Sequence, residues 1–561
     1  MTGAALMRGL FPAADPPWRS PVGPVGIVWH DEGAWVHNAR NKALFGQWRL
    51  DAWNPVFIAP VFTGLEYLSF SAFGVGVRQA RLVSAAAGFI SVLLLALGIR
   101  RIGGPLAGTI AGLLLATNYV YVMYNRAAIM EALMAAFIVA SWYCSTRAER
   151  DPRWGALAGA CATLAFFTKA AAAFYIGALG LLAVLRFLEA GSRKLEAGSG
   201  EPEAGSGKRA ALWTLAGLAA SFAAVALLFV LPHWSDYQFY NWEMSVTRKP
   251  SYDVASVLMR VSWFPILHDL FSRMWVALCA GLLGAWGIAI NWRRASDGER
   301  LLLLWVAVGS LELLIHDVGN ERRFVFLIPA LAGLFSLVLA RGSLLPAEAR
   351  GVSRRAVVLA SPLLFYTFYV LLGPIVRVPF LDQVYAGVLK VPVRLALGAA
   401  ILVTVLVCWR WLAVARTLTM PLWGRRFAGM VAGIAVGWNL VQFADWAAHR
   451  TYENYAASIM LGRVLPPETL VQGKLANGLA LENRLRPLFI GHAFGNYADR
   501  KDRWDVRYIL TYTDPEIGYE GDQILDVLDA YPGWRIIMTF DVAETRSGHD
   551  TAALIEKRAR D

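Results

Sequence analysis

Long apolar runs constrain this chain more than any other feature of its sequence. A transmembrane helix needs about 20 predominantly apolar residues to cross roughly 30 Å of hydrocarbon. The 561 residues are 57% hydrophobic and only 17% charged, a balance that soluble domains do not show. We therefore predict an all-α polytopic membrane protein. The predicted spans, about twelve, are residues 78–101, 105–124, 128–147, 154–168, 171–187, 210–232, 274–292, 301–317, 323–340, 356–376, 393–412 and 427–448.

Basic residues gather in one alternate set of the loops between these spans. Lys and Arg are retained on the cytoplasmic side of a membrane, so this set is predicted to be cytoplasmic. Its members are Arg100, Arg101, Arg147, Arg150, Arg153, Arg193, Lys194, Lys208, Arg209, Arg293, Arg294, Arg350, Arg354, Arg355, Arg416, Arg425 and Arg426. The N-terminal region 1–77 and the C-terminal region 449–561 are then extracytoplasmic, and residues 78–448 form the transmembrane domain.

The C-terminal region has the composition of a small soluble domain. Four segments, "TLVQGK", "RPLFIG", "RYILTY" and "WRIIMTFDV", are typical of short strands, and "YENYAASIMLGRVL" and "DQILDVLDAY" have helical spacing. We predict an α/β domain here. Residues 451–561 carry a net charge of −4, whereas the rest of the chain carries +16. The overall +12 is therefore a membrane-orientation signal and gives no indication of a nucleic-acid partner.

The sequence gives no indication of a cofactor. The four cysteines lie in apolar runs and show no metal-binding spacing, and no spacing among His30, His37, His233, His268 and His316 marks a metal site, although a divalent metal stays possible. Residues 188–209 repeat "EAGS" three times, which is typical of a flexible linker, here on the cytoplasmic side.

Polar residues that are costly in a membrane gather at its predicted outer boundary. Asp31 and Glu32 lie in "GIVWHDEGAWVHNARN", Glu131 opens a predicted span, and Lys169 interrupts an apolar stretch. The other members of this set are His30, Arg126, Tyr240, His316, Asn320, Arg322 and Arg323. Taken singly, Asp31 could cap a helix, Glu131 could meet a helix dipole, and the cations could be interfacial anchors.

Together these residues suit a lipid-linked sugar phosphate as substrate. Lys and Arg would neutralise the charge that develops on a phosphate leaving group. A carboxylate would take the proton of an attacking hydroxyl or amine. Two other classes stay open: a lipid-linked sugar flippase or transporter, for which we find no internal repeat, and a non-catalytic membrane scaffold.

Several motifs resemble a known family in recognisable order. They are "WHDEGAWVHNAR", "NPVFIAPVFTGLEYLSFSAFGVGVRQARLVSAAAG", "YNRAAIMEALMAAF", "FFTKAAAAF" and "NERRFVFLIPALAGL". Between about residues 29 and 340 the chain resembles the C-type-fold (GT-C) membrane glycosyltransferases, in particular the protein O-mannosyltransferase and aminoarabinose transferase (ArnT-like) type. Three positions depart from the family pattern: Ala170 after Thr168-Lys169, Phe324 after the Arg pair, and Asn54-Pro55-Val56 in the first loop.

The resemblance implies an inverting glycosyltransferase of a bacterial-type inner (plasma) membrane. Its donor would be a polyprenyl-phosphate sugar, and its acceptor a glycan, a lipid or a protein. By motif, Asp31 is the expected base with Glu32 as its partner, and Glu131 is the second acidic residue. Lys169, Arg322 and Arg323, with Arg126, would bind the donor phosphate, and His30, Asn320, His316 and Tyr240 would line the site.

The family also has a span before its acidic motif. Residues 1–28 contain no apolar run of that length, and "VGPVGIVW" is too short. We therefore expect that extending the reading frame upstream reveals the first span. Residues 56–73 contain Pro60 and Glu66 and are predicted to form an interfacial helix instead.

Overall fold

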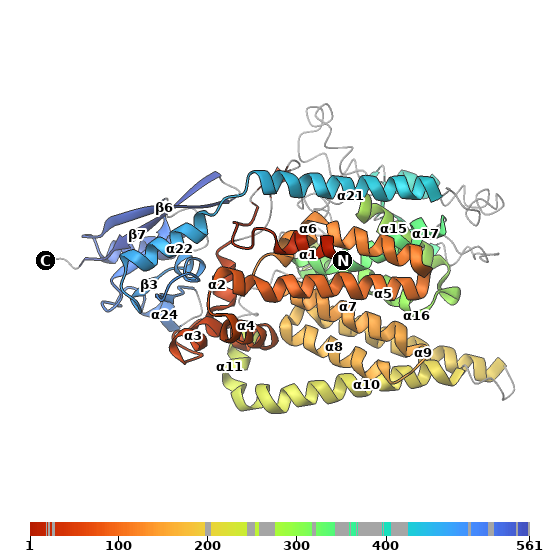
Figure 1. The fold of residues 1–561 in the computed structure, drawn as a ribbon. Helices are drawn as coiled ribbons and strands as arrows, with labels where there is room; N and C mark the ends of the chain where they lie inside the picture. The colour runs from red at the N-terminus through yellow and green to blue at the C-terminus, as the bar shows by residue number, and fades with distance from the viewer. Residues whose placement is uncertain are drawn as a thin grey trace.

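The computed structural model shows a mostly helical protein with one small sheet at its end (Figure 1). It describes residues 1–17, 19–20, 23–24, 29–196, 204–243, 253–256, 275–316, 321–342, 358–359, 361–365, 367–368, 395–396, 398–404, 425–491, 495–513, 521–545 and 548–558. The predicted class is confirmed in that the described residues are mostly helical, with several apolar helices and a small C-terminal sheet.

The helical bundle is built from long apolar helices. They are α5 (Val77–Thr117), α6 (Tyr119–Asn125), α7 (Met130–Ala148), α8 (Trp154–Thr168), α9 (Ala173–Glu196), α10 (Ala204–Val225), α15 (Trp275–Ile290), α16 (Asp297–His316), α17 (Ile328–Arg341) and α21 (Arg425–Ala448). Shorter helical turns join them: η2 (Ala170–Ala172), η3 (Ala226–Val230), η4 (Leu231–His233), α11 (Trp234–Gln238), η5 (Phe239–Glu243), η6 (Trp292–Arg294) and η7 (Glu321–Leu327). Trp142 and Trp305 are fully buried in the core of this bundle.

Helix α5 is a hairpin of two antiparallel segments. Gly104 has a φ of 86° and precedes Pro105, so the chain reverses where only glycine fits easily. A Cβ on Gly108 would lie 2.5 Å from the Cβ of Arg100, which a straight helix would hold about 12 Å away along its axis. The turn falls between the predicted spans 78–101 and 105–124.

The predicted number of twelve spans is not confirmed. Among the described residues, five helices are long and apolar enough to cross a membrane, with the hairpin α5 counted once. The number is six if α6 and α7, which are bent by 113°, count as one broken span. Two further apolar helices, Trp154–Thr168 and Ala280–Ile290, are shorter. The break at Lys169 falls between the predicted spans 154–168 and 171–187, whereas the break at Asn118 falls inside the predicted span 105–124. Much of the predicted spans 356–376 and 393–412 lies outside the described residues.

The predicted linker 188–209 is partly helical. Helix α9 continues to Glu196, and α10 begins at Ala204, while residues 197–203 lie outside the description. The "EAGS" repeats are interspersed with Lys, Arg, Leu and Glu, which are good helix formers, so their Gly and Ser residues do not exclude a helix.

A layer of short elements covers one end of the bundle (Figure 1). It contains α2 (Asp31–Trp35), α3 (His37–Phe45), η1 (Pro55–Phe57) and α4 (Pro60–Phe73). Before it in the chain come α1 (Thr2–Gly9), which packs against α5 and α6, and the paired two-residue strands β1 (Arg19–Ser20) and β2 (Gly23–Pro24). Helix α4 confirms that residues 56–73 are largely helical and do not form a span of 18 residues.

The C-terminal domain lies on this layer (Figure 1). Its helices are α22 (Glu453–Val464), α23 (Lys474–Gly478), α24 (Gly495–Ala498) and α25 (Gly521–Ala530), and its strands are β3 (Leu470–Gln472), β4 (Arg486–Leu488), β5 (Tyr508–Tyr512), β6 (Arg535–Thr545) and β7 (Gly548–Glu556). The sheet order is β4-β3-β5-β7-β6. The four predicted strands and both predicted helices are present. Strand β7 was not predicted, because its short apolar run "AALI" has no alternating pattern.

Candidate active site

Four charged side chains from four separate segments meet at the end of the bundle. Nη1 of Arg322 lies 2.5 Å from Oδ2 of Asp31, and Nζ of Lys169 lies 2.5 Å from Oε1 of Glu131. Nε of Arg322 lies 3.5 Å from the same Oε1 of Glu131. These contacts form a continuous ionic chain, Asp31–Arg322–Glu131–Lys169, which is the centre of the candidate site.

Breaks in the helices place each member of the ionic chain. Glu131 is the second residue of α7, just after the 113° bend, so its carboxylate lies at the positive end of that helix. Lys169 has an extended backbone and separates α8 from η2. Asp31 is the first residue of α2, and His30 occupies the cap position. The alternative role of Asp31 as an N-cap is therefore wrong.

Three members of the ionic chain are partly exposed, and only Glu131 is buried. The side chains of Asp31, Lys169 and Arg322 are 13%, 16% and 20% exposed, whereas that of Glu131 is 1% exposed. Charges withdrawn from water need partners, and here two cations and two carboxylates pair with one another. Oε1 of Glu131 contacts both cations, whereas its Oε2 has no hydrogen-bond partner among the described residues. A phosphate that reached these partly exposed side chains would meet the charges of Arg322 and Lys169 already in place.

Glu32 lies outside the ionic chain. Its two oxygens accept hydrogen bonds from Nε and Nη2 of Arg81 at 2.7 and 2.6 Å, and Oε1 also accepts one from the backbone N–H of Ala128 at 2.8 Å. Arg81 in turn donates to the carbonyls of Pro12 and Ala14. Glu32 thus connects α2 to α5 and to the turn that leads into Glu131.

Arg126 and Tyr240 are engaged elsewhere. Arg126 donates to the carbonyls of Met7, Arg8 and Phe11 at 2.8–3.2 Å, and its guanidinium lies 4.4 Å from the ring centre of Trp446. It therefore binds the C-terminal end of α1.

Tyr240 lies in η5 and contacts the first loop. Its hydroxyl accepts a hydrogen bond from Asn54 at 3.0 Å and donates to the carbonyl of Ala52, and its ring stacks on Phe57. The hydroxyl thus interacts with the first loop and not with the ionic chain.

The remaining predicted residues have simpler positions. His30 is buried, and its ring meets that of Trp29 edge to face at 5.4 Å. Arg323 is half-buried next to Arg322 in η7. His316 is the last residue of α16, and Asn320 lies outside the described residues.

Two further charged residues, Arg81 and Glu66, were not predicted as site residues. Arg81 lies within a motif that we used only for the family resemblance. The only sequence feature that could have marked it as a site residue is that it is a single Arg near the start of a predicted span. Glu66 of α4 is fully buried, and neither of its oxygens has a hydrogen-bond partner among the described residues. Burial raises the pKa of Glu66 well above its usual range, and the negative charge of Glu32 adds to the shift. The only sequence feature that could have marked Glu66 is that it is a single carboxylate in a largely apolar helix.

No group of three or more His, Cys, Asp or Glu side chains in the described part of the chain is arranged to hold a metal ion.

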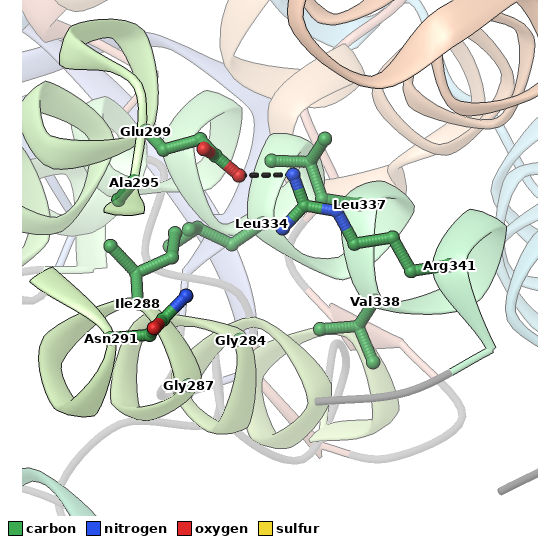
Figure 2. A pocket seen from close by; sticks show the side chains of 10 residues that line it. All are labelled: Gly284, Gly287, Ile288, Asn291, Ala295, Glu299, Leu334, Leu337, Val338 and Arg341. Carbon is green, nitrogen blue, oxygen red and sulfur yellow. Dashed lines mark hydrogen bonds and ion pairs between the residues drawn. The ribbon is translucent and has the colours of Figure 1, made fainter. Parts of the chain in front are cut away.

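A second polar cluster lies at the opposite end of α17 (Figure 2). Glu299 of α16 and Arg341 of α17 form an ion pair that faces Asn291 across a small pocket. Nineteen residues separate Arg341 from Arg322, which corresponds to roughly 30 Å along a helix. This is about the thickness of the hydrocarbon core, so the two clusters mark opposite ends of the bundle.

Comparisons with known proteins support the resemblance of the motifs. The sequence profile of the family described as dolichyl-phosphate-mannose-protein mannosyltransferase matches residues 58–195. A comparison with curated protein sequences gives no match. The structure of ArnT from Cupriavidus metallidurans bound to undecaprenyl phosphate is similar over 98% of this chain and 96% of that chain, with 16% identity and a TM-score of 0.54. The apo structure of the same protein is similar over the same shares, with 17% identity and a TM-score of 0.53.

At these identities the structural likeness shows the fold, and the profile covers the segment that carries Arg81, Glu131 and Lys169. The chain therefore has the GT-C fold of ArnT, and its resemblance to the GT-C membrane glycosyltransferases is confirmed.

Proposed function

We propose that this protein is an integral-membrane glycosyltransferase. It transfers a sugar, with inversion, from a polyprenyl-phosphate-linked donor to an acceptor at the outer face of the membrane. The observation that carries this proposal is the ionic chain Asp31–Arg322–Glu131–Lys169 at one end of an apolar helical bundle. The fold supports it, because an ArnT structure of the same fold was determined with bound undecaprenyl phosphate, a carrier of the proposed class.

The two cations are assigned to the donor phosphate. When the bond between the anomeric carbon and the phosphate oxygen breaks, that oxygen keeps the electron pair and the phosphate gains negative charge. Lys169 and Arg322 would contact this phosphate, and fixed cations stabilise such developing charge strongly in a partly dry site. Apolar helices next to the site would hold the prenyl chain.

Asp31 is assigned as the general base. The acceptor oxygen or nitrogen forms the new bond to the anomeric carbon, and its proton passes to the carboxylate of Asp31. One in-line displacement inverts the anomeric centre and needs no covalent intermediate. Glu131 keeps Arg322 and Lys169 together, and Glu32 with Arg81 fixes the position of α2.

The two rival functions predict different chemistry. A flippase would move a lipid-linked sugar without breaking its phosphate bond, and a scaffold would leave the ionic chain without a role. Release of polyprenyl phosphate from a labelled lipid-linked sugar therefore separates a transferase from both.

The test is a purified-protein assay with labelled polyprenyl-phosphate sugars and an extract of cell-envelope glycans, lipids and proteins as acceptors. Asp31→Asn should lower kcat by roughly 10²–10⁴-fold, the usual contribution of a general base. Donor KM should not rise, because the substitution removes no cation. Asp505→Asn, which changes an exposed carboxylate of the C-terminal domain, serves as the control. Near-normal kcat for Asp31→Asn would overturn the base assignment, and no release by the unaltered protein would overturn the function.

A further inference from the structure

Helix α2, which carries Asp31, is too short to hold its own position. It has five residues, and isolated helices shorter than about 12–15 residues are marginal in water. The orientation of the Asp31 carboxylate therefore depends on what α2 contacts. On one side it contacts the bundle, through Arg322 at Asp31 and through Arg81 at Glu32. On the other side it contacts the C-terminal domain.

The contact with the C-terminal domain is a direct approach of two backbones. A Cβ added to Gly33 of α2 would lie 1.8 Å from the carbonyl oxygen of Asn477 in α23. A Cβ added to Gly478 would lie 2.8 Å from Cα and Cβ of His30 and from the ring of Trp29. Contacts shorter than 3.0 Å cannot be accommodated unless the backbones separate. Glycines on both surfaces therefore bring α23 to the two sides of Asp31, at residues 30 and 33.

Arg40 fixes the same region from the next helix. Its buried guanidinium donates three hydrogen bonds of 2.9 Å to the carbonyls of Ala480, Asn483 and Leu485. No carboxylate is among these partners, and burial lowers the pKa of Arg40 to about 9. A planar guanidinium can satisfy three carbonyls at once, whereas a lysine ammonium does not reproduce this geometry.

Two aromatic and polar contacts continue the same interface. The ring of Trp53 stacks on Phe489 at 4.9 Å, and its indole N–H donates to the carbonyl of Ala34 at 2.7 Å. The carboxylate of Asp51 accepts a hydrogen bond from the backbone N–H of Phe489 at 3.3 Å. Residues 474–489, the docking segment, thus contact the first loop on either side of α2.

We propose that the docking segment of the C-terminal domain positions Asp31 for catalysis, and that Gly33, Arg40 and Gly478 are positioning residues. This inference rests on the proposed function, because it assigns the domain a task in the same site. Displacing a catalytic group by 1 Å can cost about 10²-fold in rate, and a methyl group on Gly33 requires a displacement of that size. The donor phosphate is bound from the bundle side, so donor binding does not depend on this contact.

The experiment compares Gly33→Ala, Gly478→Ala and Arg40→Lys with two controls. Gly64→Ala adds a methyl group in α4 where nothing lies within 4 Å, and Arg463→Lys changes an exposed residue of α22. For each purified protein, the stoichiometry of polyprenyl-phosphate binding gives the folded fraction. The measured values are kcat per donor-binding site, donor KM and the thermal midpoint. Asp31→Asn is measured alongside.

The three variants should lose about 10²-fold in kcat per binding site, with donor KM within threefold of the unaltered protein, and both controls should keep their kcat. The Gly33→Ala and Gly478→Ala losses should not add in the double variant, since both separate the same two surfaces. A purely structural role predicts fewer binding sites at unchanged kcat per site, which would overturn the inference. If Gly33→Ala does not fold, the kcat per donor-binding site of Arg40→Lys tests the inference instead. Full activity of Asp31→Asn would overturn the base assignment instead.

Discussion

Glu66 is a buried carboxyl group with neither a hydrogen-bond partner nor an ion-pair partner among the described residues. It lies in α4 near Glu32, whose two oxygens are occupied by Arg81. An ionised carboxylate without a partner is expensive to bury, and such groups take up a proton instead. We therefore expect Glu66 to be neutral in the folded protein, in contrast to Asp31 and Glu131, which each contact a cation.

The protonation of Glu66 predicts how the free energy of unfolding depends on pH. The folded-state pKa of Glu66 is raised above its usual value of 4.5, so the folded state holds a proton that the unfolded state releases. The contribution of Glu66 to the free energy of unfolding is thus fully present below about pH 4.5, and it is lost as the pH rises toward the folded-state pKa. Glu66→Gln should raise the thermal midpoint at pH 8 but not at pH 4. Glu468→Gln, at an exposed position, is the control, and an equal effect at both pH values would contradict the argument.

At the scale of elements, breaks in helices create the site. Lys169 lies between α8 and η2, Glu131 follows the bend between α6 and α7, and Arg322 belongs to the tight turn η7 before α17. Apolar runs predicted most of these helices, because hydrophobic length is visible in the sequence. The breaks that carry Glu131, Lys169 and Arg322 fall at or next to the predicted span boundaries. The break at Asn118 was not predicted, because "LLLATNYVYVMYN" is apolar on both sides of this residue.

We expect the two arginines of η7, Arg322 and Arg323, to contribute differently to donor binding. Adjacent residues on a 3-10 helix such as η7 point in directions about 120° apart, and the guanidinium of Arg322 contacts both Asp31 and Glu131. Loss of a charge-assisted hydrogen bond costs about 1.5–3 kcal/mol. Arg322→Ala should therefore raise donor KM and lower kcat, with kcat/KM falling roughly 10–100-fold, whereas Arg323→Ala should change it less than threefold. Steady-state kinetics with a labelled donor measures this, and a larger loss for Arg323→Ala would exchange the two assignments.

At the scale of the whole molecule, the sequence predicted the parts better than their contacts. Motif order placed Asp31, Glu131, Lys169 and Arg322 on one side of the bundle, and the structure brings these four together. Spacing and periodicity carry no information on how residue 33 meets residue 477. The contact depends on two glycines and on carbonyl groups that every residue has. The same limit explains why Arg126 and Tyr240, polar residues at the right depth, contact α1 and the first loop instead.

The docking of the two regions also constrains the topology. Because α2 packs against α23, the C-terminal domain and Asp31 must lie on the same side of the membrane, and the basic loops predict that this side is external. With the native cysteines replaced, Trp504→Cys in the C-terminal domain should react with a membrane-impermeant maleimide in intact cells. Arg150→Cys, between α7 and α8, should react only after permeabilisation; both positions are exposed. The opposite pattern would place the ionic chain at the cytoplasmic face, where the donor would have to be presented from inside the cell. Equal labelling of the two cysteines in intact cells would mean that both positions lie on the same side of the membrane. That result would contradict a bundle that crosses the membrane between Arg322 and Arg341, which are roughly 30 Å apart along a helix.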